Sequence, residues 1–326
     1  MTSLRPVVLV AVFVAALAAS LAAGAQPAAQ ARRVGVLFPA VLDPPRIEAI
    51  REGIGQALGQ AGVGVLLEPR SAGGDVDRLP ALAAGLMQAR VDVILAIAPA
   101  AVRAAREATA SMPIVAMDLE TDPIKSGLVG SLARPGGNVT GIFFDAPEVA
   151  GKWMQMLRDV VPNLQRVALL WDPSTGLAQI EAAETAARSL KIATHRVEAR
   201  KPADLVSAVR EAAGLRAGAL LVLSSPIFAS EAPRIATLAL QHKLPSITLF
   251  PLFAQSGGLL SYGPDNLDLL RQAGVFVGKV LKGAAPATLP IERPTRFRLL
   301  INVKTAKALD LTIPQSLLVQ ADELIQ

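Results

Sequence analysis

The chain has 326 residues, no cysteine and a formal net charge of +5 at neutral pH. This length is enough for two lobes with substantial cores, and the lack of cysteine excludes disulfides and thiolate metal sites. Lysine and arginine are spread over the whole chain with few aromatic residues between them, which argues against a nucleic-acid-binding protein.

The first 25 residues predict export. Arg5 precedes an almost uncharged apolar run over residues 6–21, and a small-x-small cleavage site ends at Ala25. The alternative is a signal anchor that stays in the membrane, because the apolar run approaches spanning length. No cysteine follows the run, so a lipoprotein anchor is excluded, and no second such run follows, which excludes a multispanning protein. The pattern favours a free periplasmic protein that is cleaved near Ala25.

Strand and helix patterns alternate through the first half of the chain that would remain after cleavage. Short apolar or β-branched runs predict strands, and apolar residues at helical spacing predict helices. Strands are expected over residues 33–38, 63–67, 91–97 and 113–117, and helices over 46–61, 78–88 and 100–110. Because the strands are almost continuously apolar, we expect a parallel sheet that is covered on both faces.

The same pattern starts again after a turn at residues 134–138, whose composition is Arg-Pro-Gly-Gly-Asn. Helices are expected over residues 153–160, 177–190, 202–214 and 227–242, and strands over 166–171, 192–197, 219–223 and 246–249. Two successive arrays of similar size predict an α/β fold of two doubly wound lobes, each with its strand ends open to a ligand.

The last quarter of the chain is less regular. It has a strand pattern over 257–263, a helix pattern over 266–281, a proline-rich connector over 283–294 and a strand over 297–303, with a short helix after it. We interpret the strand-helix pair as a return to the first lobe. The predicted division is a signal peptide over 1–25, lobe 1 over 32–142, lobe 2 over 143–250, a return to lobe 1 over 251–285 and the rest of lobe 2 over 286–326. The crossings then lie near residues 143–147, 250–253 and 286–294.

Several stretches identify a family resemblance. They are residues 77–84 (DRLPALAA), 131–141 (SLARPGGNVTG), 257–264 (GGLLSYGP), 299–309 (LLINVKTAKAL), 312–318 (TIPQSLL) and 321–325 (ADELI). Through them the chain resembles the substrate-binding proteins of a family of ABC-type uptake transporters, whose named relatives include a tryptophan-binding protein and which have the type I periplasmic binding fold.

The resemblance implies two lobes joined by three crossover segments, with a small-molecule ligand held between them. The closed form would be presented to a membrane permease and its ATPase. Closure requires that the ligand contact both lobes strongly enough to offset the cost of closing. We expect a monomer with no cofactor, no metal and no nucleic-acid partner.

Aromatic side chains are concentrated where a cleft would lie. Ligands of open parallel sheets bind beyond the carboxyl ends of the strands. Eight of the aromatic residues fall at predicted strand ends, at the starts of the following segments or at crossings, namely Phe38, Phe143, Phe144, Trp171, Phe228, Phe250, Phe253 and Tyr262. We predict an aromatic-lined cleft with Phe38, Phe144, Trp171, Phe250 and Tyr262 as ligand contacts. The alternative, for about half of the eight, is packing in the hinge and the lobe interface.

Polar candidates follow two strands of the first lobe. Ala98 ends a strand before a helix, where the N–H groups of Ala100 and Ala101 could hold a carboxylate. The family that this chain resembles usually has a hydroxyl residue at the position of Ala98. The resemblance therefore implies that this chain lacks one hydrogen bond to the ligand, which makes an amino-acid ligand less secure. Asp118 and Glu120 follow the next strand, and either could receive a ligand amine or another cation. The alternative for both acids is a solvated loop balanced by Lys125 or Arg134.

The second lobe repeats the arrangement. Ser224 and Ser225 stand between a strand and a helix and could either cap that helix or contact the ligand. Trp171 is expected to form one wall of the cleft, while Asp172 braces the turn after it. Asp145, at the first crossing, completes the set of candidates.

No catalytic motif occurs in the sequence. It has no Gly-x-Ser-x-Gly elbow, no phosphate-binding Gly-x-x-x-x-Gly-Lys-Ser/Thr loop and no His-Glu-x-x-His motif. Gly53, Gly55 and Gly59 do not match a dinucleotide loop, because the third glycine is too far and the run lies inside a predicted helix. We therefore predict a solute receptor that captures a small molecule, namely an amino acid, an aromatic compound or an amine-bearing compound, for an ABC permease, and not an enzyme. The alternatives are an exported sensor that reports to a membrane receptor and, less favoured, a periplasmic α/β enzyme.

Overall fold

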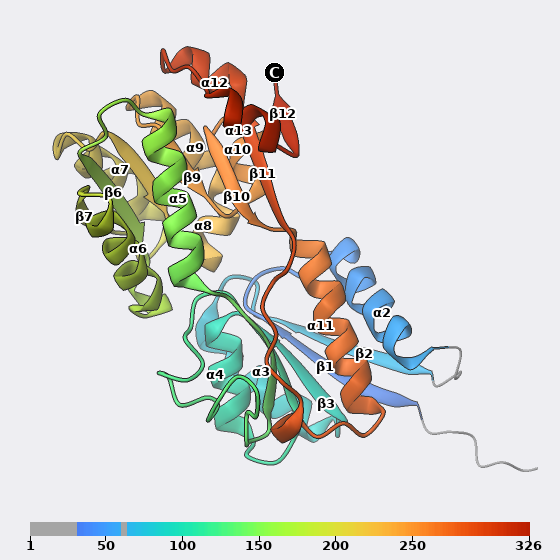
Figure 1. Cartoon of the computed structure of the whole chain (residues 1–326). Coiled ribbons are helices and arrows are strands. Elements are labelled where there is room, and N and C mark those ends of the chain that lie inside the picture. Colours follow the sequence, from blue (N-terminus) through green and yellow to red (C-terminus); the bar gives the residue numbers. More distant parts are fainter. Residues whose placement is uncertain (1–30, 60–63) are drawn as a thin grey trace, which may run out of the picture.

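Two lobes, each built on its own β-sheet, make up the molecule (Figure 1). The structure is a computed structural model that describes residues 31–59 and 64–326. The predicted signal peptide and its cleavage site lie outside the described residues. Among the described helices, none combines the length and the apolar character that a membrane crossing needs.

The first lobe has a five-stranded sheet in the order β2-β1-β3-β4-β5, and every neighbouring pair is parallel. Its strands are β1 (Arg32–Phe38), β2 (Val65–Ser71), β3 (Val93–Ile97), β4 (Ile114–Asp118) and β5 (Val139–Phe143). One face packs against α3 (Leu79–Gln88) and α4 (Pro99–Ala108), and the other against α2 (Pro44–Leu58) and α11 (Asn266–Leu281). The strands β3, β4 and β5 are buried along their whole length, as expected for a sheet covered on both faces.

The second lobe has a seven-stranded sheet in the order β12-β11-β10-β9-β8-β6-β7. Its strands are β6 (Arg166–Trp171), β7 (Ala193–Glu198), β8 (Ala219–Val222), β9 (Ser246–Thr248), β10 (Leu260–Pro264), β11 (Phe297–Asn302) and β12 (Glu323–Ile325). The sheet is parallel except where β11 runs antiparallel to β10. The two C-terminal strands therefore extend a parallel sheet in the opposite direction.

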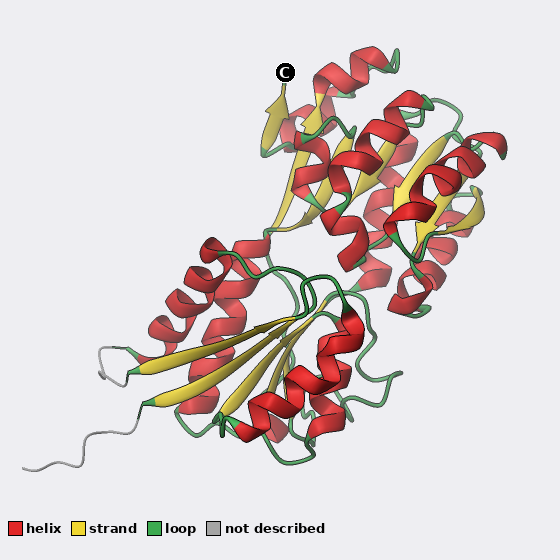
Figure 2. Ribbon diagram, turned by 180° about the vertical axis from the view of Figure 1, so that it is seen from behind, coloured by secondary structure: helices red, strands yellow, loops and turns green. Residues whose placement is uncertain are grey.

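Helices cover both faces of this second sheet (Figure 2). On one face lie α5 (Ala146–Val160), α6 (Ala178–Ser189), α12 (Val303–Ala308) and α13 (Gln315–Gln320), and on the other α7 (Leu205–Gly214), α8 (Pro226–Ser230), α9 (Ala232–Gln241) and α10 (Pro251–Gln255). Short 3₁₀ turns occupy residues 76–78, 173–175, 202–204 and 286–288. Each lobe is thus a sheet between two helical layers.

The chain crosses between the lobes three times, and the second crossing differs from the predicted place. The first lies between β5 and α5, as expected. The second crossing follows β10, because β10 pairs with β9 and β11 in the sheet of the second lobe. Of the predicted strand-helix pair, the helix α11 returns to the first lobe and the strand does not. Residues 251–264 therefore belong to the second lobe. The connector stays with the first lobe as far as Glu292, whose N–H bonds to the oxygen of Gly141, and the third crossing lies between Glu292 and β11.

Glycines allow α11 to pack closely on α2, which lies beside it in Figure 1. A Cβ atom at Gly53 would come within 1.8 Å of the backbone oxygen of Arg271, and one at Gly274 within 2.3 Å of the oxygen of Ile50. Because helices this close cannot accommodate side chains at the contact, both positions require glycine. Gly53 serves helix packing within α2 and Gly59 ends that helix, consistent with the rejection of a dinucleotide loop.

Candidate functional site

The carboxyl ends of β4 and β8 meet where the lobes face each other. The Ser224 Oγ, just after β8, donates a hydrogen bond of 2.5 Å to the Oε1 of Glu120, just after β4. The two residues are 104 positions apart in the chain, and both are buried. This hydrogen bond joins the two lobes at the strand ends where the sequence placed its candidates.

Two carboxyl groups lie inside this contact. Asp118 is 0% exposed and Glu120 is 6% exposed. The Asp118 Oδ1 accepts hydrogen bonds of 2.9 Å from the N–H groups of Glu120 and Thr121. Within residues 31–59 and 64–326, neither the Asp118 Oδ2 nor the Glu120 Oε2 has a hydrogen-bond partner. The alternative of a solvated loop is therefore wrong for these two side chains.

Burial changes the acidity of both groups. Loss of hydration raises the pKa of Asp118 above its ordinary value, although two backbone hydrogen bonds oppose the change. Burial, and then the nearby charge of Asp118, raises the pKa of Glu120 to about 8 against the opposing hydrogen bond from Ser224. With its pKa at about 8, Glu120 holds a proton at neutral pH.

The facing residues of the second lobe are held by a closed hydrogen-bond network. The Ser225 Oγ donates to the Asp172 Oδ2 at 2.7 Å and accepts from the N–H of Ile227 at 3.1 Å, so it caps α8. The Asp172 Oδ1 accepts from the N–H of Ser174 at 2.9 Å. Asp172 braces the turn after β6, as expected, and Ser225 has a capping role.

One residue of this network has no signal in the sequence. Gln179, on α6, is buried, and its side-chain amide bonds to both main-chain groups of Ser224, accepting from the N–H at 2.8 Å and donating to the oxygen at 3.0 Å. Gln179 therefore fixes the backbone that presents the Ser224 hydroxyl to Glu120. A glutamine within a helical pattern normally indicates a solvated face, so only the fold reveals this role.

The start of α4 lies beside β4. Ala98 follows β3 and its N–H bonds to the oxygen of Met117 at 2.8 Å, which places it next to Asp118. Ala98 has φ 72° and ψ 157°, a conformation that residues other than glycine rarely adopt. No side chain caps α4, and the first N–H groups of an α-helix, here those of Ala100 and Ala101, have no partner within the helix.

Two predicted cleft aromatics belong to a cluster at the crossings. The Phe144 ring lies 6.2 Å from that of Trp153 and 6.1 Å from that of Phe297, and Tyr262 stacks on Phe297 at 5.4 Å. The Trp153 Nε1 donates to the oxygen of Tyr262 at 2.7 Å. Phe144, Tyr262 and Phe297 lie near the first, second and third crossings, so these rings pack the hinge. Trp153 and Phe297 were not among the predicted residues.

The other aromatic candidates are distributed over both lobes. Trp171 is buried, and its Nε1 donates to the oxygen of Gly176 at 3.0 Å. Phe38 is half-buried under the guanidinium of Arg46, and Phe250 is half-buried between the two cores of the second lobe. The remaining three rings are core residues, namely Phe143, Phe228 and Phe253.

Asp145 acts at the first crossing. Its Oδ1 accepts from the N–H of Glu148 and so caps α5, and its other oxygen forms an ion pair with Arg293 at the third crossing. The Asp145 carboxylate thereby ties two crossing segments together.

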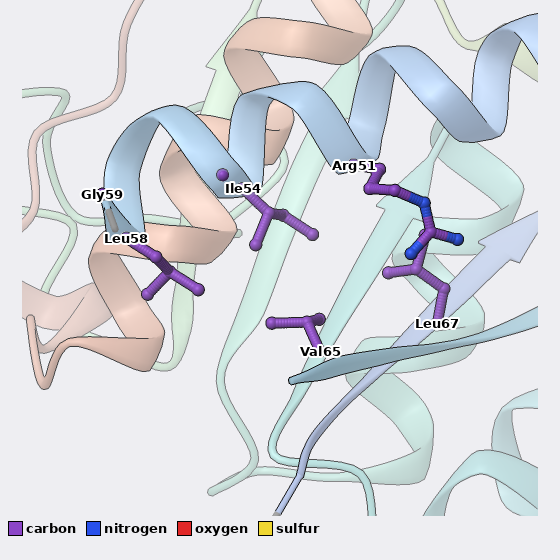
Figure 3. Close-up of a pocket in the computed structure, with 7 residues that line it drawn as sticks. Arg51, Ile54, Leu58, Gly59, Val65 and Leu67 are labelled. Atoms are coloured by element: carbon purple, nitrogen blue, oxygen red, sulfur yellow. The ribbon is translucent and has the colours of Figure 1, made fainter. Parts of the chain in front are cut away.

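A pocket of about 240 Å³ lies elsewhere, between α2 and β2 (Figure 3). Its lining is mostly apolar, with Ile54, Leu58, Val65 and Leu67 around it and Arg51 at its side. It adjoins the amino end of β2, whereas Glu120 follows the carboxyl end of β4, and no predicted site residue lines the pocket. Across the described parts of the chain, no group of three or more acidic, histidine or cysteine residues could hold a metal ion.

Comparison with known proteins gives consistent matches. The model of the family described as "ABC transporter substrate binding protein" matches residues 34–325. A tyrosine-binding protein from Clostridioides difficile is 27% identical over 278 residues, which is 83% of this chain and 79% of that protein.

Solved structures show the same architecture. An ABC domain from Streptococcus pneumoniae, solved in complex with L-Trp, superposes with a TM-score of 0.81 at 26% identity over 91% of this chain and 100% of that one. A conserved domain protein from Vibrio cholerae gives a TM-score of 0.81 at 24% identity over 90% of this chain and 100% of that one.

Proposed function

The chain belongs to the ABC transporter substrate-binding protein family and has the type I periplasmic binding fold, and on this premise we propose that it captures an amino acid between its lobes and delivers it to an ABC permease. Aromatic amino acids are the first candidates, since the similar proteins include one that binds tyrosine and one solved with L-Trp. The observation that carries the proposal is the Glu120–Ser224 contact, where buried polar groups of both lobes meet.

Binding would work by closure of the lobes about the three crossings. A ligand stabilises the closed form only through contacts that it makes with both lobes together. In the proposed site, the first lobe supplies Asp118, Glu120 and the backbone N–H groups of Ala100 and Ala101, and the second supplies Ser224. The N–H groups at the start of α4 suit a ligand carboxylate, because the amino end of a helix favours negative charge.

The aromatic residues have two proposed roles. Trp171, Phe38 and Phe250 stay as candidate walls for an aromatic ligand, since each lies at or just after the carboxyl end of a strand. Phe144 and Tyr262 support the hinge through their packing on Phe297. Ser225, Ala98 and Asp145 would act on the site through the backbone that they hold.

Export and delivery complete the proposal. We propose that the protein works in the periplasm as a monomer after cleavage near Ala25, with an inner-membrane permease and its ATPase as partners. It would release its ligand unchanged, because the family consists of binding proteins.

A thermal-shift screen tests the binding function. The chain from Gln26 onward would be heated with each of the amino acids, with aromatic acids, with amines and with nucleobases. A ligand at 100 times its dissociation constant adds about 2.7 kcal/mol to the free energy of unfolding. We expect tryptophan or tyrosine to raise the melting temperature. A folded protein whose melting temperature none of these compounds raises would contradict the proposal.

A second experiment separates delivery from sensing. A permease and an ATPase encoded beside this gene, if the genome contains them, would be reconstituted in liposomes with the liganded protein. Transport requires that the liganded protein stimulate ATP hydrolysis and ligand uptake. If a ligand binds but the liganded protein stimulates neither ATP hydrolysis nor uptake, the sensor alternative is favoured.

A further inference from the structure

We propose that ligand binding between the lobes releases one proton from the Asp118–Glu120 pair, because an ammonium group of the ligand takes the place of that proton. The ligand class is thereby restricted to compounds with a protonated amine. This inference rests on the proposed function and adds to it the charge that the site selects.

The first argument is the number of acceptors at the contact. Two carboxyl groups have four oxygens. The Asp118 Oδ1 accepts two backbone N–H bonds and the Glu120 Oε1 accepts the Ser224 hydroxyl, while the Asp118 Oδ2 and the Glu120 Oε2 have no partner within the described residues. Once Glu120 has lost its proton it can only accept hydrogen bonds, so the group that then fills these positions must be a donor, and an ammonium group carries three donors.

The second argument is burial. Both side chains are more than nine-tenths buried, so an ionised carboxylate without a partner would be costly there. Across the described parts of the chain, neither Asp118 nor Glu120 forms an ion pair with a lysine or arginine. A bound proton therefore offsets part of the negative charge.

The third argument concerns the charged groups around the pair. Asp172, from the turn after β6, adds a further negative charge that raises the pKa of Glu120. Arg103, on α4, is the cation whose charge lowers the pKa of Asp118, and burial outweighs it. On the side of α6 the neighbouring group is the neutral amide of Gln179. The surroundings thus favour an incoming cation.

The exchange balances in atoms and charge. The protonated Glu120 gives its proton to solvent, and the resulting carboxylate accepts a hydrogen bond from the R–NH₃⁺ group of the ligand. The charge-assisted bond is stronger than a neutral one and is formed at the buried interface of both lobes. No covalent bond other than that O–H bond breaks.

Calorimetry on the unaltered protein measures the proton directly. Tryptophan, tyrosine and tyramine would be titrated at about pH 6.5 in phosphate and in Tris, whose heats of ionisation differ. We expect close to one proton released per ligand, and an affinity that rises by up to about tenfold per pH unit below pH 8. Binding with no proton release and no pH dependence would overturn the inference.

Two substitutions and one control locate the proton. Glu120→Gln should abolish proton release and weaken tryptophan or tyramine binding by at least about tenfold at about pH 8. Asp118→Asn should weaken binding of the same compounds. Glu107→Gln, on the exposed face of α4, should change neither quantity. Proton release that persists in Glu120→Gln would assign the proton to another group and overturn the inference.

Deaminated analogues separate this inference from the proposed function. Indole-3-propionate and 3-(4-hydroxyphenyl)propionate keep the ring and the carboxylate but lack the amine. We expect them to bind at least about 100-fold more weakly than tryptophan and tyrosine, because they leave the two carboxyl oxygens without a donor. Equally tight binding of the analogues would overturn the amine requirement and leave the binding function intact. Binding of no compound at all would overturn the function itself.

Discussion

The strand ends of the two lobes both carry buried acids, yet their surroundings differ. Asp172, after β6, is 1% exposed, and both its oxygens accept hydrogen bonds from Ser225 and Ser174. Asp118, the last residue of β4, and Glu120, just after it, are also buried, but each keeps one oxygen without a partner in the described residues. The difference teaches that burial alone does not distinguish an acid whose oxygens are all hydrogen-bonded from one that can still accept a donor, whereas the partners of each oxygen do.

The largest effect is expected from removing the satisfied acid. Asp172→Ala leaves the Ser225 hydroxyl and the Ser174 N–H without their acceptor, which should lower the free energy of unfolding by about 3 kcal/mol. Asp75→Ala is the matched control, since the exposed Asp75 caps a 3₁₀ turn through the N–H of Asp77. It should cost about 1 kcal/mol or less. Urea unfolding measures the free energy of unfolding of both variants. Equal losses in Asp172→Ala and Asp75→Ala would contradict a special structural role for Asp172.

The unsatisfied pair should make stability depend on pH. The pKa of Glu120 is about 8 in the folded chain against an ordinary value of 4.5. Between these values the folded chain keeps a proton that the unfolded chain has lost, so the free energy of unfolding falls as pH rises and the loss is complete above pH 8. The slope from this group is at most about 1.4 kcal/mol per pH unit. Urea titrations at several pH values should show this slope, and Glu120→Gln should remove it. The same dependence of stability on pH in the variant and the unaltered protein would contradict the assignment of the slope to Glu120.

Neutralising Asp118 should cost much less than removing Asp172. In Asp118→Asn the amide oxygen still accepts from the N–H groups of Glu120 and Thr121, and no buried charge remains. We expect the free energy of unfolding to change by about 1 kcal/mol or less, in either direction. Equilibrium unfolding without ligand checks this. A loss as large as that in Asp172→Ala would show that Asp118 is a structural acid as well.

The smallest effect is expected beside the pair, at the strained turn before α4. Because Ala98 has φ 72° and ψ 157°, Ala98→Gly should raise the free energy of unfolding by about 1 kcal/mol or less. Ala100→Gly, two residues later in the helix, should lower it by about 0.5–1 kcal/mol. Thermal unfolding compares the two variants, and opposite signs are the expected outcome.

Much of the fold could be predicted from local patterns. The periodicity of apolar residues indicated the strands and helices of both lobes, because each element buries its own apolar face. The place of β10 could not be predicted, since the strand pattern over residues 257–263 fits either sheet. Its partners β9 and β11 are chosen by tertiary pairing, as is the reversed direction of β11.

The candidate site was predictable in part for the same reason. Ser224, Asp118 and Glu120 were singled out as candidates because parallel strands have their carboxyl ends on the same side of a sheet, and the structure brings Ser224 and Glu120 into contact. Gln179, Trp153 and Phe297 were missed, because a single residue in a periodic pattern does not reveal a buried polar contact or a hinge cluster. The aromatic residues at strand ends were visible in the sequence, but whether a ring faces a ligand or packs a hinge depends on neighbours from other segments.

By itself, the sequence determined the α/β class, the two lobes, the likeness to a transport family and the acids at the end of β4. Only the tertiary structure decided where the chain crosses, which acid is satisfied and which hydroxyl of the second lobe reaches Glu120. The physical reason is the distance along the sequence over which each kind of interaction acts. Periodicity and turn chemistry act over a few residues, whereas the partner of a buried oxygen is supplied by a segment such as Ser224, 104 residues away.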